Sequence, residues 1–206
     1  EISGGVIGPS AKGEEMQTQV HETIDSTIPK GWDNQLNNEI AIDVSYFRSL
    51  SIRIGNWGSM WNPYIPITFD LEPFYNVRAG TVYVQGGIGL GATLGLGHLL
   101  GTTPRRLAYS GAISSGNQAP TPWSAALFGS VEGRGVAWNT FLDGNLLSNS
   151  HSVNKNPFIY HAEVGLALRY ELLSFSYIQV IRSEEFDQQE NVQRYGSLRL
   201  GLEYSF

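Results

Sequence analysis

Residues 158–170 read Phe-Ile-Tyr-His-Ala-Glu-Val-Gly-Leu-Ala-Leu-Arg-Tyr, and this stretch alternates between two kinds of side chain. One set is apolar or aromatic: Phe158, Tyr160, Ala162, Val164, Leu166, Leu168 and Tyr170. The other set includes His161, Glu163 and Arg169. Successive side chains of a β-strand point to opposite faces, so the stretch predicts a strand with one apolar and one polar face. It is longer than the roughly 5 or 6 residues of soluble strands and reaches the roughly 9 to 11 that cross a membrane.

The same alternation recurs along the chain and predicts about eight strands. They are expected near 1–9, 37–50, 66–79, 81–97, 123–138, 157–170, 173–183 and 194–206. Short turns are expected at 79–81 and 171–172, and longer loops at 51–65, 98–122 and 139–156. Aromatic side chains stand at strand ends, as in the interfacial belts of membrane proteins: Tyr46, Tyr83, Trp123, Tyr170 and Tyr204.

Composition narrows the function classes. Charged residues make up 16% of the chain, against about 25% in ordinary soluble domains. The net charge is −6 and no Lys/Arg stripe is present, which argues against a nucleic-acid partner. The chain has no cysteine, which excludes a disulfide framework and a thiol nucleophile.

The longest apolar stretch, 86–101, carries glycine at nearly every second position and does not predict a spanning helix. A membrane crossing would therefore need a closed barrel, which leaves no backbone unpaired in lipid. We expect one all-β domain over 1–206, an antiparallel transmembrane β-barrel with apolar side chains outward and charges inward. The alternative is a β-sandwich, which shows the same alternation with apolar faces inward. The chain has no leader and begins in a strand-like run, which predicts a mature or truncated form.

Residues 10–28 break the alternation and predict a short helix in a loop. Ser10 is expected to cap it, Glu14 and Glu15 suit its positive end, and the run 29–31 ends it. Two stripes at helical spacing are expected. The apolar stripe, which we expect to be packed, is Met16, Val20 and Ile24, and the polar stripe is Gln17, His21 and Asp25.

Several runs resemble one known family. They are Gly8-Pro9-Ser10-Ala11, Gln17, His21, Gly31-Trp32-Asp33-Asn34, Phe141-Leu142-Asp143-Gly144-Asn145 and Tyr195-Gly196-Ser197-Leu198. In this order they resemble the outer-membrane lipid A deacylases, and the resemblance covers essentially the whole chain. These enzymes remove the 3′-linked acyloxyacyl group of lipid A.

The resemblance implies a bacterial outer-membrane barrel of about twelve strands, an even number as in other bacterial barrels. It implies an active site between the barrel wall and the loop helix, with lipid A, or lipopolysaccharide, as substrate within outer-membrane lipids. The implied chemistry is calcium-assisted ester hydrolysis with His21 as general base. Imidazole suits that role because it exchanges a proton near neutral pH. Calcium suits the developing oxyanion because it is a hard Lewis acid.

The chain departs from the family at its start. The family has about four further strands before the equivalent of residue 1, which with our eight make about twelve. Those strands carry an Asn-Asp pair and a hydroxyl residue tied to calcium and the oxyanion. No metal ligand is therefore assigned in this sequence, and its oligomeric state is not predicted.

Three residues are expected to support His21. Gln17 would orient the imidazole or the water, with a plain surface glutamine as the alternative. Asp25 would steer the ring, although an exposed helix charge explains it too. Glu39 would enter the strand beneath the helix and hold the site, or serve as a structural lumen charge. Ser10 lacks a Gly-x-Ser-x-Gly elbow, which argues against a nucleophile.

Other polar groups are expected to be structural. Glu132 and Arg134, two apart on one strand, should pair inside the barrel. The 143–155 loop carries Asp143, Asn145, His151 and Lys155, which suit a metal or lipid phosphate but are better explained as turn formers. The glycines between 86 and 97 lie on a strand, so they should leave lumen space or permit strand curvature rather than bind a nucleotide. Two other functions remain open, a non-enzymatic barrel (anchor or small-solute pore) and an outer-membrane phospholipase.

Overall fold

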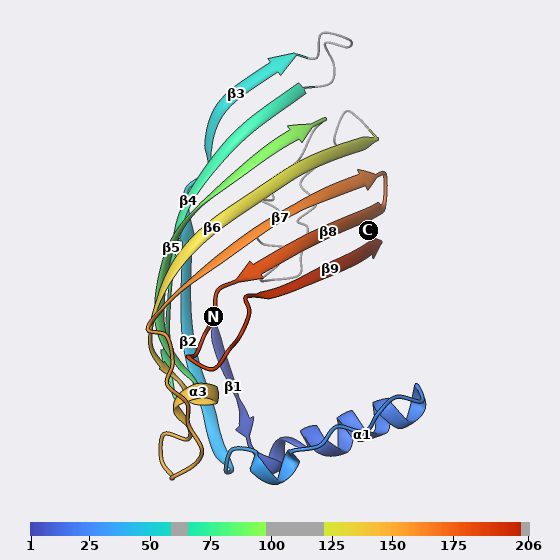
Figure 1. Ribbon diagram of the computed structural model, residues 1–206. Coiled ribbons are helices and arrows are strands. Elements are labelled where there is room, and N and C mark those ends of the chain that lie inside the picture. The colour runs from blue at the N-terminus through green and yellow to red at the C-terminus, as the bar shows by residue number, and fades with distance from the viewer. Residues whose placement is uncertain (59–65, 98–121, 203–206) are drawn as a thin grey trace.

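The computed structural model describes residues 1–58, 66–97 and 122–202, which form one antiparallel sheet of nine strands. The strands are β1 (Ile2–Ile7), β2 (Glu39–Ser49), β3 (Ile52–Gly58), β4 (Pro66–Gly80), β5 (Tyr83–Leu96), β6 (Trp123–Asn139), β7 (Phe158–Tyr170), β8 (Leu173–Arg182) and β9 (Gln193–Leu202). The sheet curls into a trough, with helix α1 (Gly13–Thr23) extending from one end of it (Figure 1). The predicted positions at 98–121 and Tyr204 to Phe206 lie outside the described residues.

Strands β2 and β3 pair with the same side of β4, one after the other along its length. Both run antiparallel to β4, β2 along its residues 74–80 and β3 along 66–71. Pro73 of β4 lies at the junction, where it has no N–H to donate and accepts the Leu50 N–H at 3.0 Å. The sheet therefore has eight ladder positions, β1-β2-β4-β5-β6-β7-β8-β9. The predicted loop over 51–65 was wrong at 52–58, where glycine, Arg53 and Asn56 interrupt the apolar alternation.

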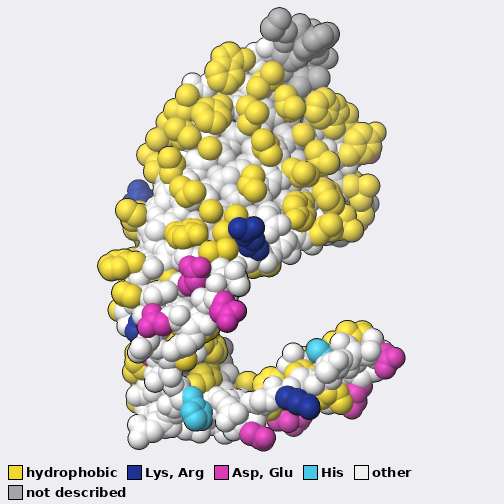
Figure 2. All heavy atoms as spheres, viewed as in Figure 1, with side chains coloured by type: hydrophobic (Ala, Val, Ile, Leu, Met, Phe, Trp, Pro, Cys, Tyr) yellow, Lys and Arg dark blue, Asp and Glu magenta, His cyan; other side chains and the backbone are white. Residues whose placement is uncertain are grey.

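The apolar face of the sheet is the exposed one. Ile88 is 73% exposed and Leu200 76%, whereas Glu132 on the other face is 3% exposed. Figure 2 shows hydrophobic side chains spread over the outer face of the strands, with charged side chains concentrated toward the α1 end. This arrangement suits hydrocarbon outside and a polar interior, so the sandwich alternative, with buried apolar faces, was wrong.

The concave face carries paired polar side chains. Arg134 lies 3.1 Å from the Glu132 carboxylate, which also accepts a hydrogen bond from Asn76 Nδ2 at 2.7 Å. Arg78 pairs with Asp43 at 2.7 Å. The predicted pairing of Glu132 with Arg134 is confirmed, and the pair lies on the concave face of the sheet. Such pairing is required because a buried charge without a partner is strongly destabilising.

The inward glycines of β5 make room for larger side chains from neighbouring strands. A Cβ at Gly87 would lie 2.2 Å from Glu132 Oε1, and one at Gly89 would lie 2.0 Å from the Phe74 ring. At both positions the room that glycine leaves on the inward face is used by a neighbouring strand rather than left open. The space is already filled by Glu132 and Phe74.

Three strands of the described sheet have one neighbour each: β1 pairs with β2, β3 with β4 and β9 with β8. The loop with α1, the short helix α3 (Thr140–Asp143) and the 183–192 connection lie at one end of the strands (Figure 1). The turn at 171–172 lies at the other end. No helix in the described part of the chain is long and apolar enough to cross a bilayer.

Candidate active site

The loop between β1 and β2 is held closed at its base. Gly8 has φ 89°, and a Cβ there would lie 2.6 Å from the Asn37 backbone, so only glycine fits the crossing. Two residues on, the Ser10 N–H donates to Asn38 Oδ1 at 2.7 Å. The first turn of the loop, η1 (Pro9–Ala11), is therefore fixed against the residues that lead into β2.

Helix α1 occupies Gly13–Thr23, within the 10–28 expected from the sequence. Its N-cap is Lys12 in a left-handed conformation (φ 56°), with no side-chain capping bond, so the expectation that Ser10 caps it was wrong. Pro9 begins the 3-10 turn η1, which includes Ser10 and Ala11, the first two residues of the predicted helix. Met16, Val20 and Ile24 are 53% to 72% exposed, so the expectation that this stripe is packed was also wrong within the described residues.

A Schellman motif ends α1 just after its histidine. The Ser26 N–H donates to the His21 carbonyl at 2.8 Å, and the Asp25 N–H donates to the Glu22 carbonyl at 3.4 Å. Asp25 takes the left-handed position (φ 52°) that glycine usually fills. The motif reverses the chain so that residues 26–28 run back beside the last helical turn.

The reversed chain fixes the imidazole of His21. Its Nδ1 lies 2.6 Å from the Thr27 carbonyl oxygen. Because a carbonyl can only accept, Nδ1 carries the hydrogen and donates it. In the neutral ring Nε2 is then a bare acceptor, the form that a general base requires.

The three supporting residues lie at different places around this ring. Gln17 is exposed one turn before His21 on the same helix face. Asp25 lies in the Schellman turn, and His21 Nδ1 is hydrogen-bonded to the Thr27 carbonyl rather than to the Asp25 carboxylate. Glu39 begins β2, away from the helix, and its Oε2 accepts from Asn145 Nδ2 at 2.8 Å and from the Leu146 N–H at 3.0 Å.

Asn145 joins the α1 loop to the β6–β7 loop. Its Oδ1 accepts the Asn37 N–H and its Nδ2 donates to the Asn37 carbonyl, both at 2.9 Å. Sequence reasoning treated Asn145 as a turn former and missed this bridge. A pair of residues 108 positions apart leaves no periodic signal from which to find it.

Asp143 is held by partners at the two ends of the 143–155 loop. Lys155 Nζ lies 2.6 Å from Asp143 Oδ1, and Asp143 Oδ2 accepts the Asn139 N–H at 2.7 Å. Both carboxylate oxygens of Asp143 are thus used within the loop. This supports the structural interpretation of the loop over metal or phosphate binding.

Calcium, the ion that the resemblance implies, does not fit the described residues. Within 1–58, 66–97 and 122–202, no three acidic, histidine or cysteine side chains gather to hold a metal ion. Glu39 Oε1 is buried without a hydrogen-bond partner. One such oxygen falls far short of the roughly six to eight that calcium takes.

We expect the backbone conformation of Asp25 to control the tautomer of His21. Asp25→Gly keeps the left-handed turn, whereas Asp25→Val strains it by roughly 1–2 kcal/mol because a β-branched residue disfavours that region. ¹⁵N NMR of the histidine rings checks this. The Gly variant should keep the Nδ1-protonated form of His21, and the Val variant should give a mixture of tautomers. An unchanged spectrum in the Val variant would show that the turn does not hold the ring.

Comparisons with known proteins agree with this architecture. The family model described as "Outer membrane protein LpxR" matches residues 1–204. Among solved structures, LpxR from Salmonella typhimurium is similar with a TM-score of 0.74 and 22% identity. The match covers 98% of this chain and 66% of the Salmonella chain, so this chain spans just under two thirds of that length. A search of curated proteins found no match. The chain belongs to the LpxR family of outer-membrane proteins.

Proposed function

We propose that this protein hydrolyses the 3′-acyloxyacyl ester of lipid A, with water activated by His21. The observation that carries the proposal is the hydrogen bond from His21 Nδ1 to the Thr27 carbonyl at 2.6 Å, which leaves Nε2 as the proton acceptor. Family membership supports the substrate class. The exposed apolar wall supports it too, because it lets acyl chains lie against the strands.

The proton transfers follow from this tautomer. Nε2 takes a proton from water as the water oxygen attacks the ester carbonyl. When the bond between the acyl carbon and the sugar oxygen breaks, the imidazolium returns the proton to that oxygen. The products are the free acyloxyacyl acid and a 3′-hydroxyl. The Thr27 carbonyl stabilises the cationic ring between the two transfers, because it keeps accepting from Nδ1.

Gln17 and Asp25 have secondary roles in this proposal. Gln17 shares the helix face of His21, so its amide can orient the water or the imidazole. Asp25 acts through the turn that brings Thr27 to the ring. Glu39 acts on the site indirectly, because its hydrogen bonds hold the β6–β7 loop to the start of β2 rather than contacting His21.

Calcium assistance remains part of the proposal by family resemblance alone. The ion would polarise the ester carbonyl when bound. The described residues supply no cage for it, so its ligands would have to come from elsewhere, and no step above runs through it.

Mass spectrometry of lipid A tests the function. The full protein, as its gene encodes it, is produced in an outer membrane that contains lipid A with its complete set of acyl chains. We expect a lipid A species lighter by the 3′-acyloxyacyl group, together with unchanged phospholipids. Unchanged lipid A in the presence of folded protein would contradict the proposal, and accumulation of lysophospholipid would favour the phospholipase instead.

A further inference from the structure

Helix α1 carries His21 but is not packed into the sheet. Among the described residues, none of the helix positions Gly13–Thr23 is buried. The helix extends from the end of the sheet on a loop (Figure 1). Where His21 lies relative to the outer wall therefore depends on the two arms of this loop, the entering arm 8–12 and the leaving arm 24–38. A contact that fixes either arm to the rest of the protein also fixes the helix.

The two arms are held against each other. Gly8 of the entering arm crosses the Asn37 backbone of the leaving arm so closely that a Cβ would lie 2.6 Å from it. Farther along the loop, the Trp32 ring packs on Gly13 at the start of α1, where a Cβ would lie 3.2 Å from the ring. The arms and the first turn of α1 therefore form one unit, and this unit is attached through Asn37.

Asn145 of the β6–β7 loop makes that attachment. Its Oδ1 accepts the Asn37 N–H and its Nδ2 donates to the Asn37 carbonyl, both at 2.9 Å. The same Nδ2 also donates to Glu39 Oε2 at 2.8 Å. A carboxamide has two N–H hydrogens, so both are used and the orientation of the amide is determined. Asn145 is 8% exposed, and its own N–H donates to Ser150 Oγ at 2.7 Å, which holds the residue in place.

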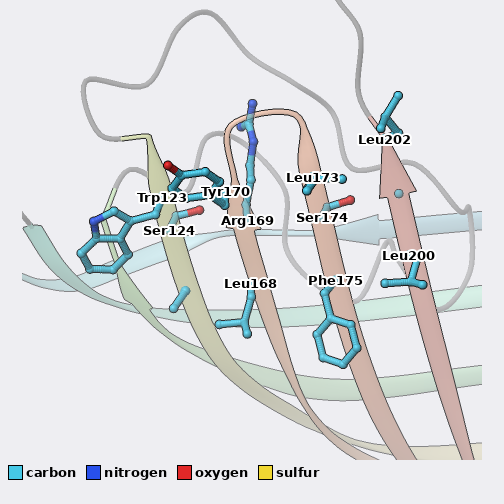
Figure 3. A pocket seen from close by; sticks show the side chains of 12 residues that line it. Trp123, Ser124, Leu168, Arg169, Tyr170, Leu173, Ser174, Phe175, Leu200 and Leu202 are labelled. Carbon is cyan, nitrogen blue, oxygen red and sulfur yellow. The ribbon is translucent and has the colours of Figure 1, made fainter.

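The other end of the sheet is too distant to hold α1. There β7 and β8 are joined by the two-residue turn 171–172, and Leu168, Phe175 and Leu200 line a recess (Figure 3). Strand β6 runs from that end to the α1 end over 17 residues, and at about 3.3 Å per residue it separates the two ends by roughly 50 Å of strand. The contacts that position α1 therefore belong to the loops beside it.

We propose that Asn145 is a positioning residue that sets the place of α1, and with it the place of His21 Nε2. Its role in the reaction rests on the proposed function. A general base works only within hydrogen-bond reach of the proton that it removes. A misplacement of about 1 Å, even one caused far from the chemistry, lowers a rate by about 10²-fold. Asn145 contacts neither the water nor the ester in this mechanism, and it acts through Asn37 and the loop arms.

Steady-state kinetics on lipid A separate positioning from substrate binding. In the full protein, Asn145→Ala should lower kcat and kcat/KM equally, by about 10²-fold, and leave KM unchanged. Asn145→Asp keeps the shape of the side chain but places an oxygen against the Asn37 carbonyl and the Glu39 carboxylate, so it should lose as much. A raised KM with an unchanged kcat, or a full rate in Asn145→Asp, would overturn the proposal.

Asn156→Ala is the matched control for Asn145→Ala. Asn156 is a half-buried asparagine of the same β6–β7 loop, but its Nδ2 donates to the Glu184 carbonyl at 2.9 Å, in the 183–192 connection rather than in the α1 loop. This variant should keep kcat within about twofold of the parent. An equal loss of kcat in both variants would assign the effect to the β6–β7 loop as a whole and would contradict the role of Asn145.

The distance between two spin labels tests the positioning of α1 without any hydrolysis. Cysteines for the labels replace Gln19 on α1 and Ala137 on β6, both exposed, in a chain that has no other cysteine. Pulsed EPR should give one narrow distance in the parent and in Asn156→Ala, and a broadened or shifted distribution in Asn145→Ala. An unchanged distribution in Asn145→Ala would overturn the proposal whether or not the protein acts on lipid A. A broadened distribution in a protein that leaves lipid A intact would sink the proposed function alone and leave Asn145 as the residue that positions α1.

Discussion

Replacing His21 by glutamine should lower the rate of lipid A deacylation by about 10²- to 10⁴-fold, the usual contribution of a general base. Glutamine keeps a polar group at this position but cannot take a proton from water. The helix should survive, because glutamine is a good helix former and His21 is only half-buried. The rate is measured from the lighter lipid A species by mass spectrometry in membranes with equal amounts of folded protein.

His151→Gln is the matched control. This histidine is exposed in the β6–β7 loop, and the same chemical change there should leave the rate within about twofold of the parent, as for most surface substitutions. If His21→Gln were as active as His151→Gln, His21 would not be the base, and the mechanism built on its tautomer would fall.

Replacing Gly89 by leucine should prevent the sheet from assembling. A Cβ at Gly89 would lie 2.0 Å from the Phe74 ring and 2.4 Å from the Val131 carbonyl oxygen. The ring can move, but the carbonyl belongs to the neighbouring strand and cannot. The cost should reach or exceed the upper end of the roughly 1–3 kcal/mol typical of over-packing.

The mobility of unheated protein on a detergent gel measures this loss, because folded barrels and unfolded chains migrate differently. Gly133→Ala on β6 is the control, since a Cβ there would meet nothing within 4 Å. We expect the folded band for Gly133→Ala and its absence for Gly89→Leu. A normal folded band for Gly89→Leu would mean that the interior is looser than these contacts require.

The strands could be predicted well because the two faces of the sheet lie in different environments. Apolar and polar residues therefore alternate along each strand with a period of two. On β7, Phe158 to Tyr170 alternate in exposure as they alternate in polarity. Residues 52–58 were not predicted as a strand because glycine, Arg53 and Asn56 interrupt the alternation of apolar residues there. They form β3 because they pair with β4 beyond Pro73, where β2 ends. Long-range register, rather than local pattern, makes that segment a strand.

The candidate site was only partly predictable. The helical spacing of Gln17 and His21 is local, so the sequence placed both on one face. The partner of the His21 ring is a backbone carbonyl, which carries no residue signature, and it is reached through the left-handed Asp25. The link from Asn37 to Asn145 depends on two loops meeting in space. These contacts follow from the folded chain rather than from any motif.

Oxygen accessibility of spin labels along β7 tests the orientation of the sheet most directly. The chain has no cysteine, so single cysteines at 162–168 can each be labelled uniquely. In vesicles, labels at Ala162, Val164, Leu166 and Leu168 should collide often with dissolved oxygen and rarely with a water-soluble nickel reagent. Labels at 163, 165 and 167 should not show this high collision rate with oxygen. If the even-numbered positions were instead shielded from both reagents, protein rather than lipid would cover the apolar face, and the barrel account would be contradicted.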